Sequence, residues 1–248
     1  MNANSSTALL EWLLHKTGGY FILVVVAISQ IATYLFTIPV SLFIRLNAEF
    51  TNEQFNQLWV ATIISMLLAL ATLLIYTYVT NRQAVIRLHE AVKMTPLPIN
   101  AAQEQQAWKQ VSGLPWLYAR SSTLITILIG FTPMLVFETF SLRLQTDQII
   151  YTVLGVLISS LSIITLGMIG LEGMITPARR LLLPKSYDAQ LTGTSGLKIL
   201  PRLNLIILTL IIVGILLVAP IGYRFTLLAL QSPDRPDLLL NYQAQSLG

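Results

Sequence analysis

Long runs of apolar residues dominate the chain, and the polar residues are gathered between them. Five runs are long enough to cross a bilayer core as helices, which requires about 20 apolar residues each. They cover approximately residues 18–44, 58–78, 121–140, 149–175 and 203–223. Transmembrane strands would instead alternate apolar and polar residues over about ten positions. The pattern predicts an all-α fold, a polytopic membrane bundle of five transmembrane helices.

The composition also indicates that lipid surrounds most of the chain. Of the 248 residues, 54% are hydrophobic and 10% are charged, whereas soluble domains contain about 25% charged residues. A soluble fold of this size would have too few charged side chains to cover its surface. We therefore expect an integral membrane protein in contact with lipid.

The lysines and arginines predict an orientation. Eleven of the 15 belong to one side, at Lys16 and in two long connections, residues 81–120 and 176–202. The other four are Arg45, Arg143, Arg224 and Arg235. Because cytoplasmic loops carry the excess of positive charge, the N-terminus and both long connections are expected in the cytoplasm and the C-terminus outside. The predicted location is a bacterial inner (plasma) membrane or a related bacterial membrane, with the chain crossing it several times.

Three sections follow from this topology: an N-terminal interfacial segment (1–17), a five-span membrane domain (18–230) and a polar extracytoplasmic tail (231–248). Residues 8–15 form a candidate helix on the cytoplasmic interface, with Trp12 at headgroup depth. The alternative is a helical extension of the first span that is broken at Gly18 and Gly19. Both interpretations remain open from the sequence.

The first long connection contains a candidate surface for a cytoplasmic partner. A polar helix is expected over residues 99–111, with Asn100 as its N-cap and Gly113 at its end. Trp108, Lys109 and Trp116 are the residues we expect a soluble partner to contact.

Small residues recur along one side of the fourth span. They are Gly155, Ser159, Ser162, Gly170 and Gly173. Small side chains let membrane helices approach closely, so this span is expected at a helix–helix contact, either within the chain or against a second copy. Membrane lipids, other membrane subunits or a homodimer are the partners to expect.

Prolines interrupt three spans, at Pro39, Pro133 and Pro220. Each removes a backbone hydrogen bond and can kink its helix. Three kinks at similar depth would shape a cavity for a lipid or small apolar ligand, although membrane helices also tolerate proline without any such role.

Only two ionisable residues fall at membrane depth, and each has a possible partner. Glu138 can pair with Arg143 near the outer end of the third span. Glu172 can pair with Arg179 near the inner end of the fourth span, if the helix continues past Pro177. These groups are interpreted as interface ion pairs, with proton relays as the alternative.

The residue inventory excludes several chemistries. Cysteine is absent and histidine occurs twice, which leaves no disulfide, thiolate nucleophile or zinc cluster to expect. No catalytic, cofactor-binding or metal-binding residue is predicted, and we expect the protein not to be an enzyme. No nucleic-acid partner is expected, because the cations are divided among loops without an aromatic platform.

The segment Met174-Ile175-Thr176-Pro177-Ala178-Arg179-Arg180-Leu181 resembles the start of a HAMP signal-transfer helix. Together with Ala107-Trp108 and Leu114-Pro115-Trp116, the layout is similar to the membrane domain that precedes HAMP and the catalytic domain in bacterial class III adenylate cyclases. The resemblance implies a sensory or regulatory domain, with a sixth span and an output domain beyond Gly248. It transfers no catalytic residue to this chain.

Three functions are therefore compared. The first is a non-catalytic sensory or regulatory membrane domain of a bacterial signalling protein. The second is an accessory structural subunit of a larger membrane complex. The third, a small-solute transporter, is the weakest, because Gln30 and hydroxyl groups are the only polar groups at mid-depth.

Overall fold

A computed structural model describes residues 3–93 and 101–183, together with residues 203–204, 207–216, 218 and 222. The main elements are α1 (Ala3–Thr17), η1 (Gly18–Tyr20), α2 (Phe21–Tyr34), α3 (Thr37–Ala48), α4 (Asn52–Thr80), α5 (Arg82–Lys93), α6 (Ala101–Ile125), η2 (Thr126–Phe131), α7 (Thr132–Val136), η3 (Phe137–Ser141), α8 (Thr146–Met174) and α9 (Thr176–Leu181). Of these, η1 is a 3₁₀ turn and η2 and η3 are π-helical. The described part contains no strand, so the predicted all-α class is confirmed there.

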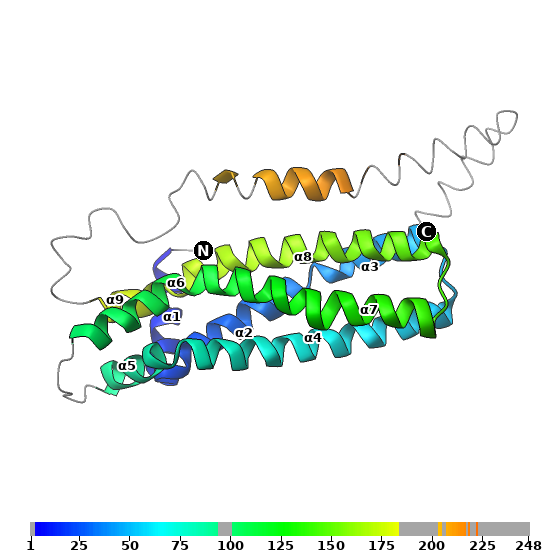
Figure 1. The fold of residues 1–248 in the computed structure, drawn as a ribbon. Coiled ribbons are helices and arrows are strands. Elements are labelled where there is room, and N and C mark those ends of the chain that lie inside the picture. Colours follow the sequence, from blue (N-terminus) through cyan, green and yellow to red (C-terminus); the bar gives the residue numbers. More distant parts are fainter. Residues whose placement is uncertain are drawn as a thin grey trace, which may run out of the picture.

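The long helices lie side by side in an elongated bundle (Figure 1). Four described segments are long and apolar enough to cross a membrane: Ala8–Arg45, Asn52–Thr80, Ala102–Ser141 and Thr146–Met174. These segments identify the chain as a membrane protein. Of the fifth predicted span, the structure describes residues 203–204, 207–216, 218 and 222, and these include the shorter apolar helix Ile207–Leu216. The hydroxyls of Thr209 in this helix and Thr165 in α8 are hydrogen-bonded at 3.1 Å.

Helix α4 shows why hydrocarbon is the solvent of the bundle. Its only buried residues are Leu58, Leu73 and Thr77, while large apolar side chains such as Leu67 and Ile75 are more than 60% exposed. Exposing this surface to water would cost about 25 cal/mol per Å². A helix that is apolar on all sides and still exposed is stable only in lipid.

Helix α6 does not end at Gly113, so the expected separate polar helix is wrong. The helix runs through Gly113 and Pro115 and continues through η2, α7 and η3 to Ser141. Its buried positions continue at helical spacing across the expected stop: Ala107, Val111, Leu114 and Tyr118. This apolar stripe packs on the bundle on both sides of Gly113, and the packing overrides the local stop signal. The expected N-cap, Asn100, lies outside the described residues.

The continuous segment from Ala102 to Ser141 has 40 residues, which corresponds to about 60 Å of helix. A bilayer core is about 30 Å thick. The bundle therefore extends beyond the hydrocarbon, and the N-terminal part of α6 lies in this extension together with α1, α5 and α9 (Figure 1).

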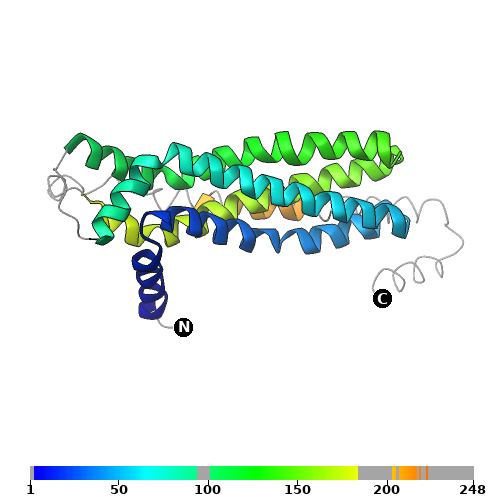
Figure 2. The same cartoon turned by 90° about the horizontal axis from the view of Figure 1, so that it is seen from below.

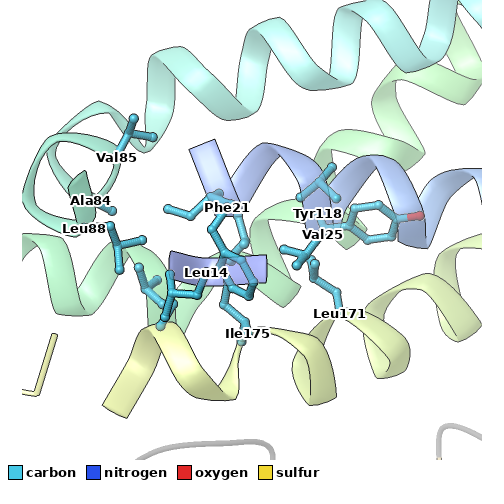
Figure 3. Close-up of a cluster of buried hydrophobic side chains, with 14 of the residues drawn as sticks. Leu14, Phe21, Val25, Ala84, Val85, Leu88, Tyr118, Leu171 and Ile175 are labelled. Carbon is cyan, nitrogen blue, oxygen red and sulfur yellow. The ribbon is translucent and has the colours of Figure 1, made fainter. Parts of the chain in front are cut away.

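Two hydrophobic clusters stabilise the two ends of the bundle. The inner cluster joins α1, α2, α4, α5, α6, α8 and α9 and includes Leu14, Phe21, Val25, Leu88, Tyr118, Leu171 and Ile175 (Figure 3). The outer cluster joins α3, α4 and α8 and the turn after η3, with Val40, Phe43, Ile44, Leu58, Leu142 and Ile158. The inner cluster is the larger of the two and connects the extension to the membrane-spanning part.

The contact between η1 and α5 depends on two glycines. A Cβ atom on Gly19 would lie 2.0 Å from the carbonyl oxygen of Val85, and Gly18 has a φ of +57° beside His89. Only glycine fits this close approach and this left-handed backbone. From this turn α1 points away from the bundle axis (Figure 2), as expected for either a break at Gly18-Gly19 or an interfacial helix.

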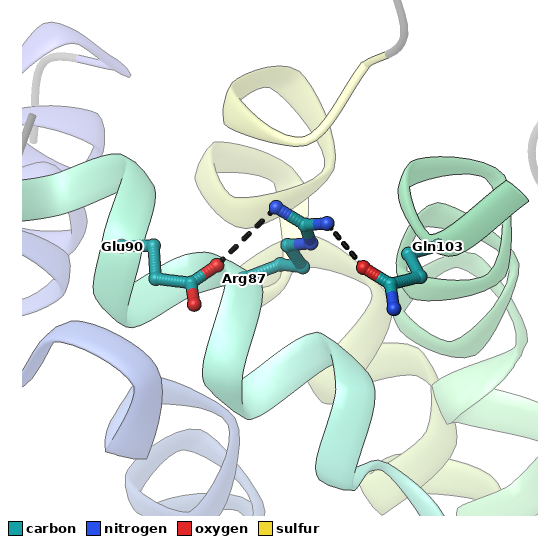
Figure 4. Close-up of polar contacts among 3 residues, drawn as sticks. All are labelled: Arg87, Glu90 and Gln103. Carbon is teal, nitrogen blue, oxygen red and sulfur yellow. Dashed lines mark hydrogen bonds and ion pairs between the residues drawn. The ribbon is translucent and has the colours of Figure 1, made fainter. Parts of the chain in front are cut away.

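Polar side chains fix α5 in place. The Gln110 side chain of α6 accepts a hydrogen bond from the Ala84 backbone N–H and donates one to the Thr80 carbonyl, both at 2.9 Å. It thereby satisfies backbone groups on both sides of the break between α4 and α5. Arg87 adds hydrogen bonds to Glu90 within α5 and to Gln103 of α6 (Figure 4).

The glycine contact gives a matched stability test. Gly19→Ala is expected to lower the free energy of unfolding by about 1–3 kcal/mol, because the methyl group collides with backbone. Gly113→Ala is the control, since nothing lies within 4 Å of its Cβ position, and it is expected to be neutral or slightly stabilising. Unfolding in detergent measures both, and equal stabilities of the two variants would contradict the close packing of η1 on α5.

Candidate functional site

A cavity of about 150 Å³ lies within the membrane-spanning part, between α2, α3, α4, η2, α7 and α8. Its walls are apolar residues and hydroxyls, together with the amide of Gln30. None of the described residues that line it is charged. The cavity therefore suits an uncharged molecule, because burying an ion here would leave it without a counter-charge.

Helix breaks border the cavity. The break between α2 and α3 lies at Leu35 and Phe36, and Pro39, in the first turn of α3, has no N–H for the Leu35 carbonyl. The Leu35 carbonyl instead accepts a bond from the Ile38 N–H at 3.3 Å. Val40 and Ser41, directly after the proline, line the cavity.

Pro133 lies at the second irregularity, where the continuous helical segment changes from the π-helical η2 to α7. It follows the π-helical segment η2 and cannot donate to the carbonyl of Ile129, one turn earlier. The hydroxyl of Ser65 in α4 donates to this carbonyl at 2.9 Å. A neighbouring helix thus satisfies a backbone group that lipid cannot. The third interrupting proline, Pro220, lies outside the described residues.

A polar cluster lies at one end of the cavity. The Tyr118 hydroxyl donates to the Gln30 side-chain oxygen at 2.5 Å. Tyr34 donates to the Met66 carbonyl at 2.8 Å. These bonds orient the Gln30 amide, which is buried and lines the cavity, and connect α2 with α4 and α6.

Tyr118 belongs to the cavity's polar cluster and also to the inner cluster, where it is 1% exposed. Its ring packs on Gly167 of α8, where a Cβ atom would lie 2.3 Å from the Tyr118 hydroxyl oxygen. The Ser29 hydroxyl donates to the Gly167 carbonyl at 3.0 Å, beside this contact. Three helices therefore meet at Gly167, which the sequence did not distinguish from the other glycines of the same apolar helix.

The predicted packing residues of α8 have different surroundings. A Cβ atom on Gly155 would lie 2.3 Å from Ile44, so α3 packs directly on this glycine. Ser159 lines the cavity and Ser162 is half-buried. Gly170 and Gly173 are exposed. A Cβ atom on Gly170 would make ordinary contacts of 3.8 Å with Ser29 of α2 and with Met174, whereas no described residue lies within 4 Å of the Cβ position of Gly173. The five small residues therefore do not form one packing face. Helix α8 packs on α3 near its start and on α2 and α6 near its end, from different sides.

The predicted pair of Glu172 and Arg179 is present. Their side chains approach to 3.8 Å, and Arg179 also donates to the Ser112 carbonyl of α6 at 3.1 Å. The chain reaches this geometry because α9 starts at Thr176, with Pro177 in its first turn. The pair connects α8, α9 and α6 at the inner end of the bundle.

The predicted pair of Glu138 and Arg143 is wrong. Arg143 lies in a turn with a φ of +48° and is exposed, whereas Glu138 is fully buried in η3. Neither carboxyl oxygen of Glu138 has a hydrogen-bond partner among the described residues. The chain turns after Ser141, and this turn directs Arg143 away from the glutamate.

The predicted partner surface is not one face. Lys109 and Trp116 are exposed, and their spacing of seven residues places them on the same side of α6. Trp108 is half-buried and lies on a different side. Lys109 and Trp116 therefore belong to an exposed face that Trp108 does not share.

The comparisons with protein-family models, curated proteins and solved structures find no match to this chain. Among the described residues, no three His, Cys, Asp or Glu side chains gather to hold a metal ion. The cavity and the polar cluster next to it are the candidate site on which the functional argument rests.

Glu138 supplies a prediction about stability. Glu138→Leu is expected to raise the free energy of unfolding by about 1–3 kcal/mol, because a buried polar group without partners is removed. Glu53→Leu, an exposed glutamate in α4, is the control and is expected to change stability by less than about 0.5 kcal/mol. Unfolding in detergent distinguishes them. A loss of stability in Glu138→Leu would mean that this carboxyl group has a stabilising partner.

Proposed function

We propose that the chain is a non-catalytic sensory or regulatory membrane domain of a bacterial signalling protein. The observation that carries the proposal is the position of Tyr118, which hydrogen-bonds Gln30 at the cavity and is fully packed in the inner cluster. A molecule in the cavity contacts Gln30, the hydrogen-bond partner of Tyr118, and the cytoplasmic extension packs on the other side of Tyr118. The same side chain therefore couples the two regions.

Close packing makes this coupling effective. Tyr118 contacts Gly167 so tightly that neither α6 nor α8 can shift there without displacing the other. Packed interiors respond to such displacement by adopting another arrangement, since they contain little free space. A ligand changes the balance between two arrangements only if it binds one of them better. A cavity bordered by two helix irregularities gives a ligand different affinities for the two arrangements, because the volume of the cavity changes when the helix segments move.

The distribution of charge supports a cytoplasmic location for the extension. Among the described residues, eight lysines and arginines lie at the end that contains α1, α5 and α9, and Arg45 and Arg143 lie at the other. With the N-terminus in the cytoplasm, α5, α6 and α9 present the surface that an output partner would contact. The resemblance of the α8–α9 segment to the start of a HAMP helix belongs to the same proposal.

Spin labels at the inner end test the coupling. The chain has no cysteine, so Arg82→Cys in α5 and Arg180→Cys in α9, both exposed, provide a unique label pair. Filling the cavity with Ala69→Phe is expected to shift the distance between the labels by about 2 Å, the scale of helix shifts in switching proteins. Pulsed electron paramagnetic resonance in lipid nanodiscs measures this distance.

Ala71→Phe is the matched control, because Ala71 lies on the same helix and faces outward. It is expected to leave the label distance at the wild-type value. Both single cysteines are also expected to react with an impermeant reagent from the cytoplasmic side only. An unchanged distance in Ala69→Phe contradicts the coupling, and labelling from the opposite side contradicts the orientation.

An accessory structural subunit is the second candidate function. The exposed Gly173 favours it, since no described residue lies within 4 Å of its Cβ position and small residues on the outside of a membrane helix suit a tightly packed helix of another subunit. In native purification, this function predicts stoichiometric recovery with other membrane proteins, and Gly173→Leu is expected to reduce it. Recovery as a lone monomer or homodimer contradicts it. Transport is supported least, since the cavity wall, as far as the structure describes it, contains no charged residue.

A further inference from the structure

We propose that the cavity binds the ring of a quinone-type lipid, that is, an uncharged, carbonyl-bearing ring with an aliphatic tail. This inference deepens the proposed function by naming the class of ligand to which the membrane domain would respond. Three properties of the cavity support it: the size of the cavity, the charge of its walls and the hydrogen-bond donors that face it.

The size of the cavity fits a single ring. Its volume is about 150 Å³, and a dry cavity of about this size in another protein is large enough to bind benzene. The cavity is partly open rather than enclosed and lies among helices that face lipid. A ring can occupy it while an aliphatic tail extends into the bilayer.

The walls exclude charged headgroups. The polar groups that line the cavity are the Gln30 amide and the hydroxyls of serine, threonine and tyrosine, beside aromatic rings such as Trp59. A phosphate or carboxylate would find no cation among the described residues of the wall, and its desolvation would be uncompensated. The ligand is therefore neutral.

The hydrogen-bond inventory indicates an acceptor on the ligand. Most hydroxyls of the wall donate to backbone carbonyls, as Thr62 does to Leu58 at 2.8 Å and Ser160 does to Val156 at 2.7 Å. Their protons are thereby used. Ser159 and Thr126 also line the cavity, and neither hydroxyl has a hydrogen bond to another described residue. These two hydroxyls can donate to a ligand carbonyl.

Gln30 provides the further donor. Its oxygen accepts the hydrogen bond from Tyr118, so the donors that remain on this side chain are the protons of its NH₂ group. This group carries two protons. One is directed to the hydroxyl oxygen of Tyr34, whose own proton goes to the Met66 carbonyl, and the other is left for a ligand. A linear acyl chain would make no use of these donors, whereas the carbonyl oxygens of a quinone are acceptors only.

Fluorescence of Trp59 tests the assignment directly. The chain has four tryptophans, and replacing Trp12, Trp108 and Trp116 by Phe leaves the one that lines the cavity. Titrating this variant in nanodiscs with 2-decyl-1,4-benzoquinone is expected to give saturable quenching. Decylbenzene, which has a six-membered ring of similar size and the same tail but no carbonyls, is the competitor and is expected to bind about tenfold more weakly, the value of one hydrogen bond.

Variants assign the effect to the cavity. Ala69→Phe is expected to abolish the saturable component, and Ala71→Phe to retain it. Ser159→Ala and Gln30→Leu are each expected to weaken quinone binding several-fold and to leave decylbenzene binding unchanged. Because Gln30→Leu also removes the acceptor of the Tyr118 hydrogen bond, unfolding of this variant is measured in parallel. If Gln30→Leu is unstable, Ser159→Ala still tests the assignment.

Three outcomes overturn the inference. Quenching that rises linearly and is equal in Ala69→Phe indicates only partition of the quinone into the bilayer. Equal affinity for decylbenzene removes the role of the carbonyls, and displacement of the quinone by bilayer lipid alone assigns the cavity to an acyl chain. The proposed function is judged separately, since a label shift in Ala69→Phe without quinone binding preserves the coupling and rejects only the ligand.

Discussion

Hydrocarbon offers no hydrogen-bond partner to a peptide group, and this constraint determines how the bundle is built. Wherever a helix is broken within the membrane-spanning part, the protein must satisfy the exposed backbone itself. Ser65 does so for the Ile129 carbonyl, from a different helix. The irregular backbone thus becomes a point at which two helices are hydrogen-bonded to each other. This bond fixes the relative position of the two helices next to the cavity.

At the inner end of the bundle, the helices are held together by close packing at glycines as well as by hydrogen bonds. Gly19 lets η1 contact the backbone of α5, and Gly167 lets the Tyr118 ring contact α8. Both contacts place large apolar side chains of neighbouring helices within one cluster. A membrane interior gives no hydrophobic gain for helix association, so such van der Waals contacts have to supply it. Outside the hydrocarbon, the burial of α5 and α6 adds the ordinary hydrophobic contribution.

These two features connect the cavity with the part of the bundle that extends beyond the hydrocarbon. Tyr118 is held by Gln30 on the cavity side and by Gly167 on the α8 side. Arg179 adds a second connection at the same end, from Glu172 of α8 to the Ser112 carbonyl of α6. Since both connections run between α6 and α8, a change in the separation of these helices affects every element of the extension that packs on them.

The sequence alone determined the solvent, the helical class and the segregation of charge, because these follow from composition and from the length of apolar runs. It also predicted the pair of Glu172 and Arg179, whose spacing of two helical turns places both groups on one side. Only the tertiary structure decided that α6 continues through Gly113, that Arg143 turns away from Glu138, and that Gly167 rather than Gly170 is packed. Each of these depends on which neighbour lies against a given side of a helix, and helical spacing specifies a side without specifying what will cover it.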